Sequence, residues 1–238
     1  MLKISIIIPI LNEASTIDSL LDHLLSSAYK KENIQEILIA DGGSTDGSQA
    51  VITAFKKSRN DRLIQLISSA KGRARQMNTA AALSRGAILY FLHADSFPPT
   101  AYDQHIIEQV QQQKLAGCFR MKFDDTHWWL RLAGWLTKFK YRACRGGDQS
   151  QFITRELFEE LGRYNEAYTI YEDNDLINKL YARNEFVVIQ KWLITSARKY
   201  HTNGVWKLQY HFWAIYVKKW LGASPEALYQ YYKKHITG

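Results

Sequence analysis

The stretch ISIIIPI at positions 4–10 constrains the fold most strongly, because it is apolar and mostly β-branched. A strand with apolar side chains on both faces must be covered on both faces, as strands of parallel sheets are. The apolar residues that follow recur with the spacing of one helix face; they are Ile17, Leu20, Leu21, Leu24, Leu25 and Ala28. A buried strand followed by an amphipathic helix is the beginning of a βαβ unit.

The same alternation continues along the chain. It predicts strands at 36–41, 62–68 and 87–95, a helix that buries Ala50, Val51, Ala54 and Phe55, and a helix at 73–84. After position 100 it predicts helices at about 100–113, 156–162 and 172–183, strands at 115–123, 149–155, 185–190 and 194–200, and a helical, aromatic tail from about 203 to 235. We therefore expect an α/β fold with a Rossmann-like, mostly parallel sheet flanked by helices.

Composition limits the cellular location. With 46% hydrophobic and 23% charged residues, the chain can bury a core. Its two cysteines, Cys118 and Cys144, form no Cys-x-x-Cys pair, which excludes a thiolate zinc site and fits a reducing cytosol. The apolar N-terminal run breaks at Pro9, and no apolar stretch is long enough to span a membrane. We expect a cytoplasmic protein, with a peripheral position at the inner membrane surface left open.

The formal net charge of +8 favours anionic partners. Nucleic acid is not favoured among them, because the chain has no RNA-binding signature and no dense basic helix. Phosphorylated small molecules and an anionic membrane surface remain.

The carboxyl ends of four consecutive predicted strands carry unusual residues, most of them polar. They are Pro9, Asn12 and Glu13 at the end of the first, Asp41, Gly42 and Gly43 at the end of the second, Lys71, Gly72, Arg73 and Arg75 beyond the third, and His93 and Asp95 at the end of the fourth. Ligands of open parallel sheets bind beyond the carboxyl ends of the strands. Any single one of these residues can be a helix cap, but four consecutive occurrences favour a ligand site.

The chemistry of these residues suggests a nucleotide. An acid at a strand end accepts hydrogen bonds from a base or ribose, glycines allow close approach of the backbone, and arginines pair with phosphate oxygens. Asp95 offers an oxygen ligand to Mg²⁺ or Mn²⁺, and His93, two residues before it on the predicted strand 87–95, is expected on the same face as a second candidate ligand. The chain has neither a P-loop nor a Gly-x-Gly-x-x-Gly motif, so a P-loop NTPase and a dinucleotide dehydrogenase are not indicated.

Four segments resemble the family 2 glycosyltransferases of the GT-A fold, over about residues 3–200. They are ISIIIPILNEASTI, LIADGGSTDGS, GRARQMNTAAALSRGAILYFLHADS and YEDNDL. Within that family the chain is similar to a bacterial subgroup with GRARQMN, FLHAD, GDQ and TSAR motifs, which is often labelled as associated with arsenosugar biosynthesis. The resemblance implies an inverting, metal-dependent transfer of a sugar from a nucleotide-diphosphate donor, with Mg²⁺ or Mn²⁺ as cofactor. The motif of processive polysaccharide synthases, Gln-x-x-Arg-Trp, is absent.

The resemblance also implies roles for individual residues. The donor-binding start of the family contains Pro9, Asn12 and Glu13. In the second-strand signature Asp41 matches the first acid, and Gly42 replaces the second. Asp95 matches the metal-binding acid and His93 replaces its usual partner acid, whereas Asp173, with Glu172 beside it, matches the catalytic base. An inverting transfer needs a base for the acceptor hydroxyl and a cation for the departing diphosphate, so Asp173 and Asp95 suit these two tasks. The acidic start of the helix at 172–183 also has a plain explanation in the helix dipole.

Several further residues are candidates with an open role. Asp148 and Gln149 are expected either to line the acceptor pocket or to form a turn. Arg198 is a candidate for neutralising the diphosphate, and His201 is either a further metal ligand or, more commonly for a single histidine, a structural residue.

Two segments, 127–142 and 205–221, are both aromatic and basic. This composition suits a membrane interface, although the helical spacing of the aromatics favours packing on the core or on the partner of a homodimer. We expect a GT-A domain at 1–202, with a nucleotide-sugar-binding half at 1–99 and an acceptor half at 100–202, and a helical extension at 203–238. The expected acceptor is a small molecule; a polyprenyl-phosphate acceptor at a membrane, or a non-catalytic nucleotide-sugar-binding module, are the alternatives.

Overall fold

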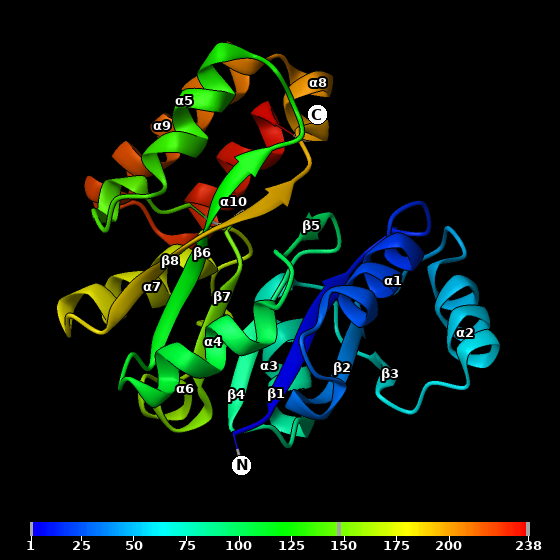
Figure 1. Cartoon of the computed structure of the whole chain (residues 1–238). Coiled ribbons are helices and arrows are strands. Elements are labelled where there is room, and N and C mark those ends of the chain that lie inside the picture. Colours follow the sequence, from blue (N-terminus) through cyan, green and yellow to red (C-terminus); the bar gives the residue numbers. More distant parts are fainter. Residues whose placement is uncertain (1, 147–148, 237–238) are drawn as a thin grey trace.

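The computed structural model describes residues 2–146 and 149–236 (Figure 1). Its strands are β1 (Ile4–Ile10), β2 (Ile34–Asp41), β3 (Ile64–Ser68), β4 (Ile88–Phe91), β5 (Ser96–Phe97), β6 (Ala116–Phe123), β7 (Gln151–Thr154) and β8 (Phe186–Thr195). Within the described residues these strands form one eight-stranded sheet in the order β3-β2-β1-β4-β7-β6-β8-β5.

Helices flank this sheet. They are α1 (Ile17–Ser27), α2 (Ser48–Arg59), α3 (Arg73–Leu83), α4 (Tyr102–Gln111), α5 (Trp128–Leu136), α6 (Arg155–Glu160), α7 (Glu172–Ala182), α8 (Arg198–Asn203), α9 (Val205–Trp220) and α10 (Pro225–His235), with short 3-10 turns at Lys31–Asn33 and Arg142–Cys144. The prediction of an α/β fold with a mostly parallel sheet flanked by helices is confirmed.

Strand β1 is buried on both faces, as its composition predicts. Ile6 and Ile8 belong to a core cluster that also holds residues of α1 and α4, and Ile7 belongs to a second cluster that holds residues of α3 and α7. β1 pairs in parallel with β2 on one side and with β4 on the other. Because β2 and β3 lie on one side of β1 and β4 on the other, the strand order reverses between β1 and β4, which is where open α/β sheets bind ligands.

The second half of the sheet is mixed, and one prediction there is wrong. The strands expected at 185–190 and 194–200 are a single strand, β8, followed by helix α8. The strand stops because the backbone N–H of Ala197 donates to Asp124 Oδ1 at 2.7 Å, and the N–H of Arg198 donates to Ser196 Oγ at 3.2 Å. These side chains take backbone donors that a strand would use in its ladder.

The prediction that Ala50, Val51, Ala54 and Phe55 form the buried face of α2 is correct only in part. Ile52 and Ser48 are buried, and Val51 and Phe55 pack partly against the core, whereas Ala50 and Ala54 are exposed. Helix α2 lies beside the edge of the sheet near β3 (Figure 1) and covers it with a narrow apolar stripe.

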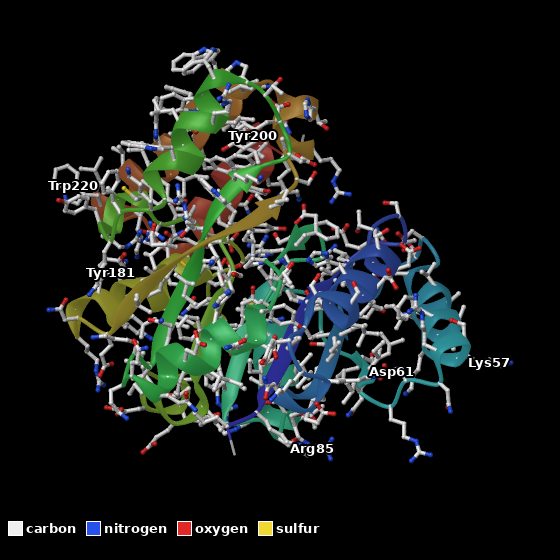
Figure 2. All side chains as sticks on the ribbon, viewed as in Figure 1. Lys57, Asp61, Arg85, Tyr181, Tyr200 and Trp220 are labelled. Carbon is white, nitrogen blue, oxygen red and sulfur yellow. The ribbon has the colours of Figure 1, made fainter. Side chains whose placement is uncertain are left out.

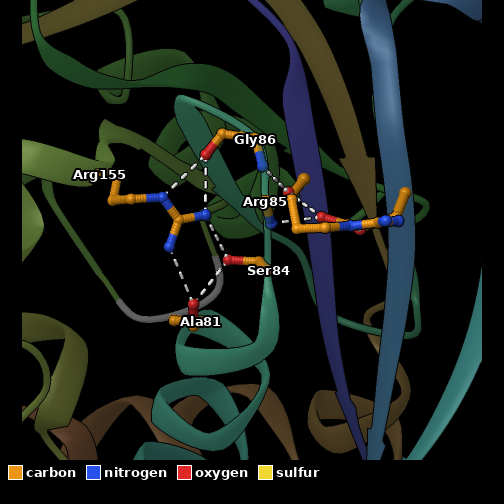
Figure 3. Close-up of polar contacts among 7 residues, drawn as sticks. Ala81, Ser84, Arg85, Gly86 and Arg155 are labelled. Carbon is orange, nitrogen blue, oxygen red and sulfur yellow. Dashed lines mark hydrogen bonds and ion pairs between the residues drawn. The ribbon is translucent and has the colours of Figure 1, made fainter.

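A polar cluster joins three elements at the end of the sheet opposite the carboxyl ends of β1 and β4 (Figure 3). Arg155, at the start of α6, donates to the carbonyl of Gly86 at 2.8 Å and to the carbonyl of Ala81 at 3.1 Å. It also donates to Ser84 Oγ at 2.8 Å. These bonds fasten the end of α3 to the beginning of β4, and so fix the two elements whose other ends carry Arg73 and His93.

The segment at 127–142 contains helix α5, which packs beside α9 through side chains such as Trp129, whose Nε1 donates to Gln209 Oε1 at 3.0 Å. Leu130, Leu208 and Leu228 belong to a third core cluster, which joins α5, α9 and α10. Searched over the described residues, none of the helices has the length and apolar character that a membrane crossing requires.

Candidate active site

A cavity of about 280 Å³ opens at the carboxyl ends of β1 and β4. Its walls come from β1, the start of α3, the turn after β4, the end of β8, α8 and α9. The lining residues are Pro9, Ile10, Leu11, Glu13, Lys71, Gly72, Arg73, Gln76, His93, Ala94, Asp95, Thr169, Thr195, Ser196, Arg198, Lys199, Tyr200, Leu208 and Phe212. Residues from both halves of the chain therefore meet at the predicted edge of the sheet.

His93 and Asp95 lie in a turn, not on a strand. β4 ends at Phe91, and the N–H of Ser96 donates to the carbonyl of His93 at 3.1 Å, which closes the turn before β5. The argument that an i, i+2 spacing on a strand places both side chains on one face does not apply here. Both residues nevertheless line the cavity.

Four cationic residues line the same cavity. Arg73 begins α3 and Lys71 precedes it by two residues, and Arg198 and Lys199 begin α8. Gly72 lies between the first two with φ of 132°, a backbone conformation that favours glycine. Cations converging on a carboxylate and an imidazole suit an anionic ligand with a bound metal, such as a diphosphate.

Arg73 connects this cavity to two buried acids at the start of α7. Its Nη1 lies 3.2 Å from Glu172 Oε1 and 3.3 Å from Asp173 Oδ2. The side chain of Glu172 is 1% exposed and that of Asp173 11%. Burying carboxylates is costly unless a cation accompanies them, and the guanidinium of Arg73 fulfils this requirement.

The backbone is strained directly before these acids. Tyr171 precedes α7 with φ of 77°, an uncommon conformation for a bulky side chain that costs about 1–3 kcal/mol. Its ring is held by Tyr168, at 6.0 Å between ring centroids, and by Tyr216 of α9, at 5.7 Å. Packing against α9 therefore helps to set where Glu172 and Asp173 lie.

Asp173 faces a second, inner cavity of about 10 Å³, which shares Pro9 and His93 with the larger one. This is about the volume that one water molecule requires. Gln149, Gln151 and Tyr164 also line it, together with Met77, Phe91 and Leu92. The Tyr164 hydroxyl and both side-chain amide atoms of Gln151 make no hydrogen bond within the described part of the chain.

Tyr164 stays protonated beside Asp173. Burial raises the pKa of the Tyr164 hydroxyl, and the carboxylates of Asp173 and Glu172 raise it further, although Arg73 partly opposes them. The inner cavity therefore combines a carboxylate, a phenol and two amides around a volume that one water can occupy.

Several predicted residues lie outside both cavities. Asn12, Asp41, Gly42, Arg75 and Glu172 line neither, and Asp148 lies outside the described residues. Arg75 Nε lies 3.9 Å from Glu166 Oε2 at the surface. His201 Nε2 lies 3.1 Å from Asp125 Oδ2 and does not line either cavity.

Asp41 and Asn12 shape the loops behind the cavity. Asp41 accepts hydrogen bonds from the Ser44 hydroxyl at 2.6 Å and the Ser44 N–H at 2.9 Å. Asn12 Oδ1 accepts from the N–H of Thr45 at 2.8 Å. Burial alone would raise the pKa of Asp41, but the hydrogen bonds from Ser44 and Gln49 outweigh it, so this pKa is lower than usual.

Gln76 lines the cavity, but it was not predicted from the sequence. It belongs to the motif GRARQMN, in which no spacing or residue type distinguishes it from its neighbours. Its Nε2 donates to the carbonyls of Ile10 at 2.7 Å and Ala40 at 2.8 Å, which joins the ends of β1 and β2. A Cβ on Gly42 would lie 3.0 Å from Gln76 Cδ, so the absence of a side chain at this position makes room for Gln76.

Arg198 pairs with Glu13, and both residues line the cavity. Its Nη2 lies 3.1 Å from Glu13 Oε1, which joins α8 to the loop after β1. Thr169, Leu208 and Phe212 complete the wall from the C-terminal part of the chain. No sequence pattern predicted that these three residues line the cavity, because only the tertiary packing of the C-terminal part against the sheet brings them to it.

A divalent cation fits these residues only with help from a ligand. Within residues 2–146 and 149–236, no three His, Cys, Asp or Glu side chains form a group that can hold a metal ion alone. Asp95 and His93 nevertheless provide a carboxylate and an imidazole beside four cationic side chains that suit phosphate. Mg²⁺ is commonly held by one or two carboxylates together with substrate phosphates, so this donor set fits such an arrangement.

Comparison with known sequences identifies related proteins. The family model described as Glycosyl transferase family 2 matches residues 5–162. A PGL/p-HBAD biosynthesis glycosyltransferase of Mycobacterium bovis is 29% identical over 179 residues, which are 72% of this chain and 66% of that protein. Glycosyltransferase AglE of Haloferax volcanii is 35% identical over 95 residues, 40% of this chain and 31% of its own. The chain thus spans less than two thirds of the length of either relative.

Solved structures share the fold. The mannosyltransferase PcManGT from Pyrobaculum calidifontis, in complex with GDP-Man and Mn²⁺, matches with a TM-score of 0.70 and 19% identity, over 99% of this chain and 68% of that one. S. aureus TarS 1-349, in complex with UDP, matches with a TM-score of 0.67 and 17% identity, over 82% of this chain and 60% of that one.

Proposed function

The chain belongs to glycosyl transferase family 2, and from this membership we propose that it transfers a sugar from a nucleotide-diphosphate donor to an acceptor hydroxyl, with inversion at the anomeric carbon. The observation that carries the proposal is the cavity between the ends of β1 and β4, where Asp95 and His93 meet four cationic side chains beside buried Asp173. The narrower subgroup indicated by GRARQMN, FLHAD, GDQ and TSAR stays a prediction.

The donor diphosphate is expected between α3 and α8. Lys71 and Arg73 approach it from one side and Lys199 from the other, so the charge that develops on the leaving group meets cations already in place. Arg198 joins them if the diphosphate displaces its contact with Glu13. The glycosyltransferase relatives and the structures solved with UDP and GDP-Man support a donor of this class.

Asp95, with His93, would hold the divalent cation. Such a cation, Mg²⁺ or Mn²⁺, neutralises the diphosphate and so favours its departure. PcManGT was solved in complex with Mn²⁺, which agrees with the donor set in this cavity.

Asp173 is proposed to take the proton of the acceptor hydroxyl. It lines the inner cavity, and its Oδ2 lies 3.3 Å from Nη1 of Arg73, which lines the larger cavity. Gln149 lines that inner cavity with Asp173, which supports its predicted place near the acceptor. Glu172 is more deeply buried, so we assign it the role of positioning Arg73.

The experiment compares two aspartates in the first turn of α7. Asp173→Asn removes the proposed base and keeps its size, so we expect the turnover number to fall about a hundredfold or more while donor affinity is retained. Asp175→Asn is the matched control, because Asp175 Oδ2 lies 3.5 Å from Lys179 Nζ and Asp175 lines neither cavity. Release of nucleoside diphosphate from a panel of nucleotide sugars measures the rate, and the anomeric configuration of the product reports inversion.

Two results would contradict the proposal. Unchanged turnover in Asp173→Asn would exclude Asp173 as the base. Tight donor binding without turnover across many acceptors would instead identify a non-catalytic nucleotide-sugar-binding module.

A further inference from the structure

Helix α9 is apolar on two opposite faces. Leu208 and Ile215 are buried on its inner face, and Leu208 and Phe212 line the cavity. The outer face carries a second stripe at helical spacing, formed by Trp206, Tyr210, Trp213, Val217, Trp220 and Leu221. Each of these side chains is at least 49% exposed, and Trp220 is 83% exposed. Packing within this chain explains why the inner face is apolar, but it does not explain why the exposed outer stripe is apolar.

Helix α5 extends the same surface. Trp128, Leu132 and Trp135 follow the spacing of one helix face, and all three are exposed. The rings of Trp128 and Trp206 lie 5.6 Å apart, so the stripes of α5 and α9 are continuous where these rings meet. We call this continuous area the aromatic surface.

The two segments that form the aromatic surface carry only positive formal charge. Segment 127–142 contains four Lys or Arg residues, segment 205–221 contains three, and neither contains Asp or Glu. These two segments therefore carry most of the chain's formal net charge of +8. Lys138 Nζ lies 3.9 Å from the centre of the Trp135 ring, so at least one of these cations borders the aromatic side chains directly.

We propose that the aromatic surface docks on an anionic lipid bilayer, with α9 and α5 lying in the plane of its interface. Trp and Tyr are the side chains that favour the boundary between lipid headgroups and acyl chains, and Lys and Arg beside them are attracted to anionic headgroups. A second copy of the chain fits less well, because the excess of Lys and Arg in these two segments would repel the same segments of another copy.

This docking brings the cavity close to the membrane. The inner face of α9 lines the cavity while its outer face carries the aromatic stripe, so the two are separated by about one helix diameter, ~10 Å. An acceptor carried by a lipid could then reach the cavity. The docking itself does not depend on the proposed sugar transfer, since vesicle binding is measured without donor.

Co-sedimentation of the full chain with vesicles tests the proposal. We expect binding to vesicles of phosphatidylcholine mixed with phosphatidylglycerol, weaker binding to phosphatidylcholine alone, and a blue shift of tryptophan emission on binding. The triple variant Trp128→Ser, Tyr210→Ser, Trp220→Ser should bind at least tenfold more weakly. The double variant Arg131→Glu, Lys207→Glu should lose the preference for phosphatidylglycerol.

Matched controls come from exposed residues outside the aromatic surface. Tyr29→Ser with Leu83→Ser removes apolar side chains that are 55% and 59% exposed, and Lys57→Glu reverses a charge at the edge opposite Trp220 (Figure 2). Both should bind vesicles as the parent does. Thermal unfolding of every variant verifies its folding.

Three results would overturn the proposal. They are no binding to anionic vesicles, unchanged binding by the folded triple variant, and a dimer in sedimentation velocity that the triple variant abolishes. The last would identify the aromatic surface as an interface between copies.

Discussion

Glu36 shows at the level of single residues how a buried charge is kept in this fold. Its side chain is 1% exposed and accepts hydrogen bonds from the Ser5 hydroxyl at 2.7 Å, the Arg85 N–H at 2.6 Å and Arg85 Nε at 2.8 Å. Burial raises the pKa of Glu36, but these hydrogen bonds and the Arg85 charge lower it by more, so the pKa is below its usual value. The contacts join β1, β2 and the turn before β4.

This shift predicts a pH-dependent effect of Glu36→Gln. Because the pKa is lower in the folded state, ionised Glu36 stabilises the fold at neutral pH, and this contribution is lost as the pH falls through the lowered pKa. We expect the substitution to cost about 1–3 kcal/mol at neutral pH and progressively less below about pH 4. Urea unfolding of both proteins across this range measures the difference; a difference that does not change with pH would contradict the assignment.

Individual positions also explain departures from the family pattern. Gly42 stands where the resemblance leads one to expect an acid, and the structure gives it a packing reason, since a side chain would crowd Gln76. His93 stands in place of another expected acid, yet it lines both cavities, the larger one together with the candidate metal ligand Asp95 and the inner one together with the candidate base Asp173.

At the level of elements, β6 is the strand that holds the second half of the sheet together. It lies between β7 and β8, and Gly117 pairs with Phe152 of β7 and Val187 of β8. The backbone approaches so closely there that a Cβ on Gly117 would lie 2.3 Å from the Val187 carbonyl oxygen. Real Cβ atoms do not tolerate this distance, so the strands would have to separate.

We therefore expect Gly117→Ala to destabilise the chain by about 1–3 kcal/mol or more, as overpacking does. Gly146→Ala is the control, because a Cβ there would meet no atom of the described residues within 4 Å. Differential scanning calorimetry should show a lower melting temperature for Gly117→Ala alone. Equal melting temperatures for the two variants would mean that the packing around β6 is looser than described.

At the level of the whole molecule, the cavity joins distant parts of the chain, so its ligand should stabilise the entire fold. A ligand that binds only the folded state at a hundred times its Kd adds about 2.7 kcal/mol to the free energy of unfolding. We expect a nucleoside diphosphate with Mn²⁺ to raise the melting temperature more than either does alone. The increase that requires Mn²⁺ should disappear in Asp95→Ala and persist in Asp22→Ala, whose acid lies on α1 outside both cavities. Synergy that survives in Asp95→Ala would place the metal elsewhere.

The sequence by itself determined the alternation of strands and helices, the burial of β1 on both faces and the family. It also marked Arg73, Asp95 and Asp173 from their local motifs. These features follow from residue type and short-range spacing, which decide how one element buries its own faces.

Only the tertiary structure decided which of the marked residues share a cavity and which lie behind it. It brought α8 and α9 over the sheet edge, ended β8 at Thr195 and left one of the two apolar faces of α9 exposed. The physical reason is that periodicity states which side of an element is apolar but not what covers that side. Contacts between residues far apart in the chain make that choice.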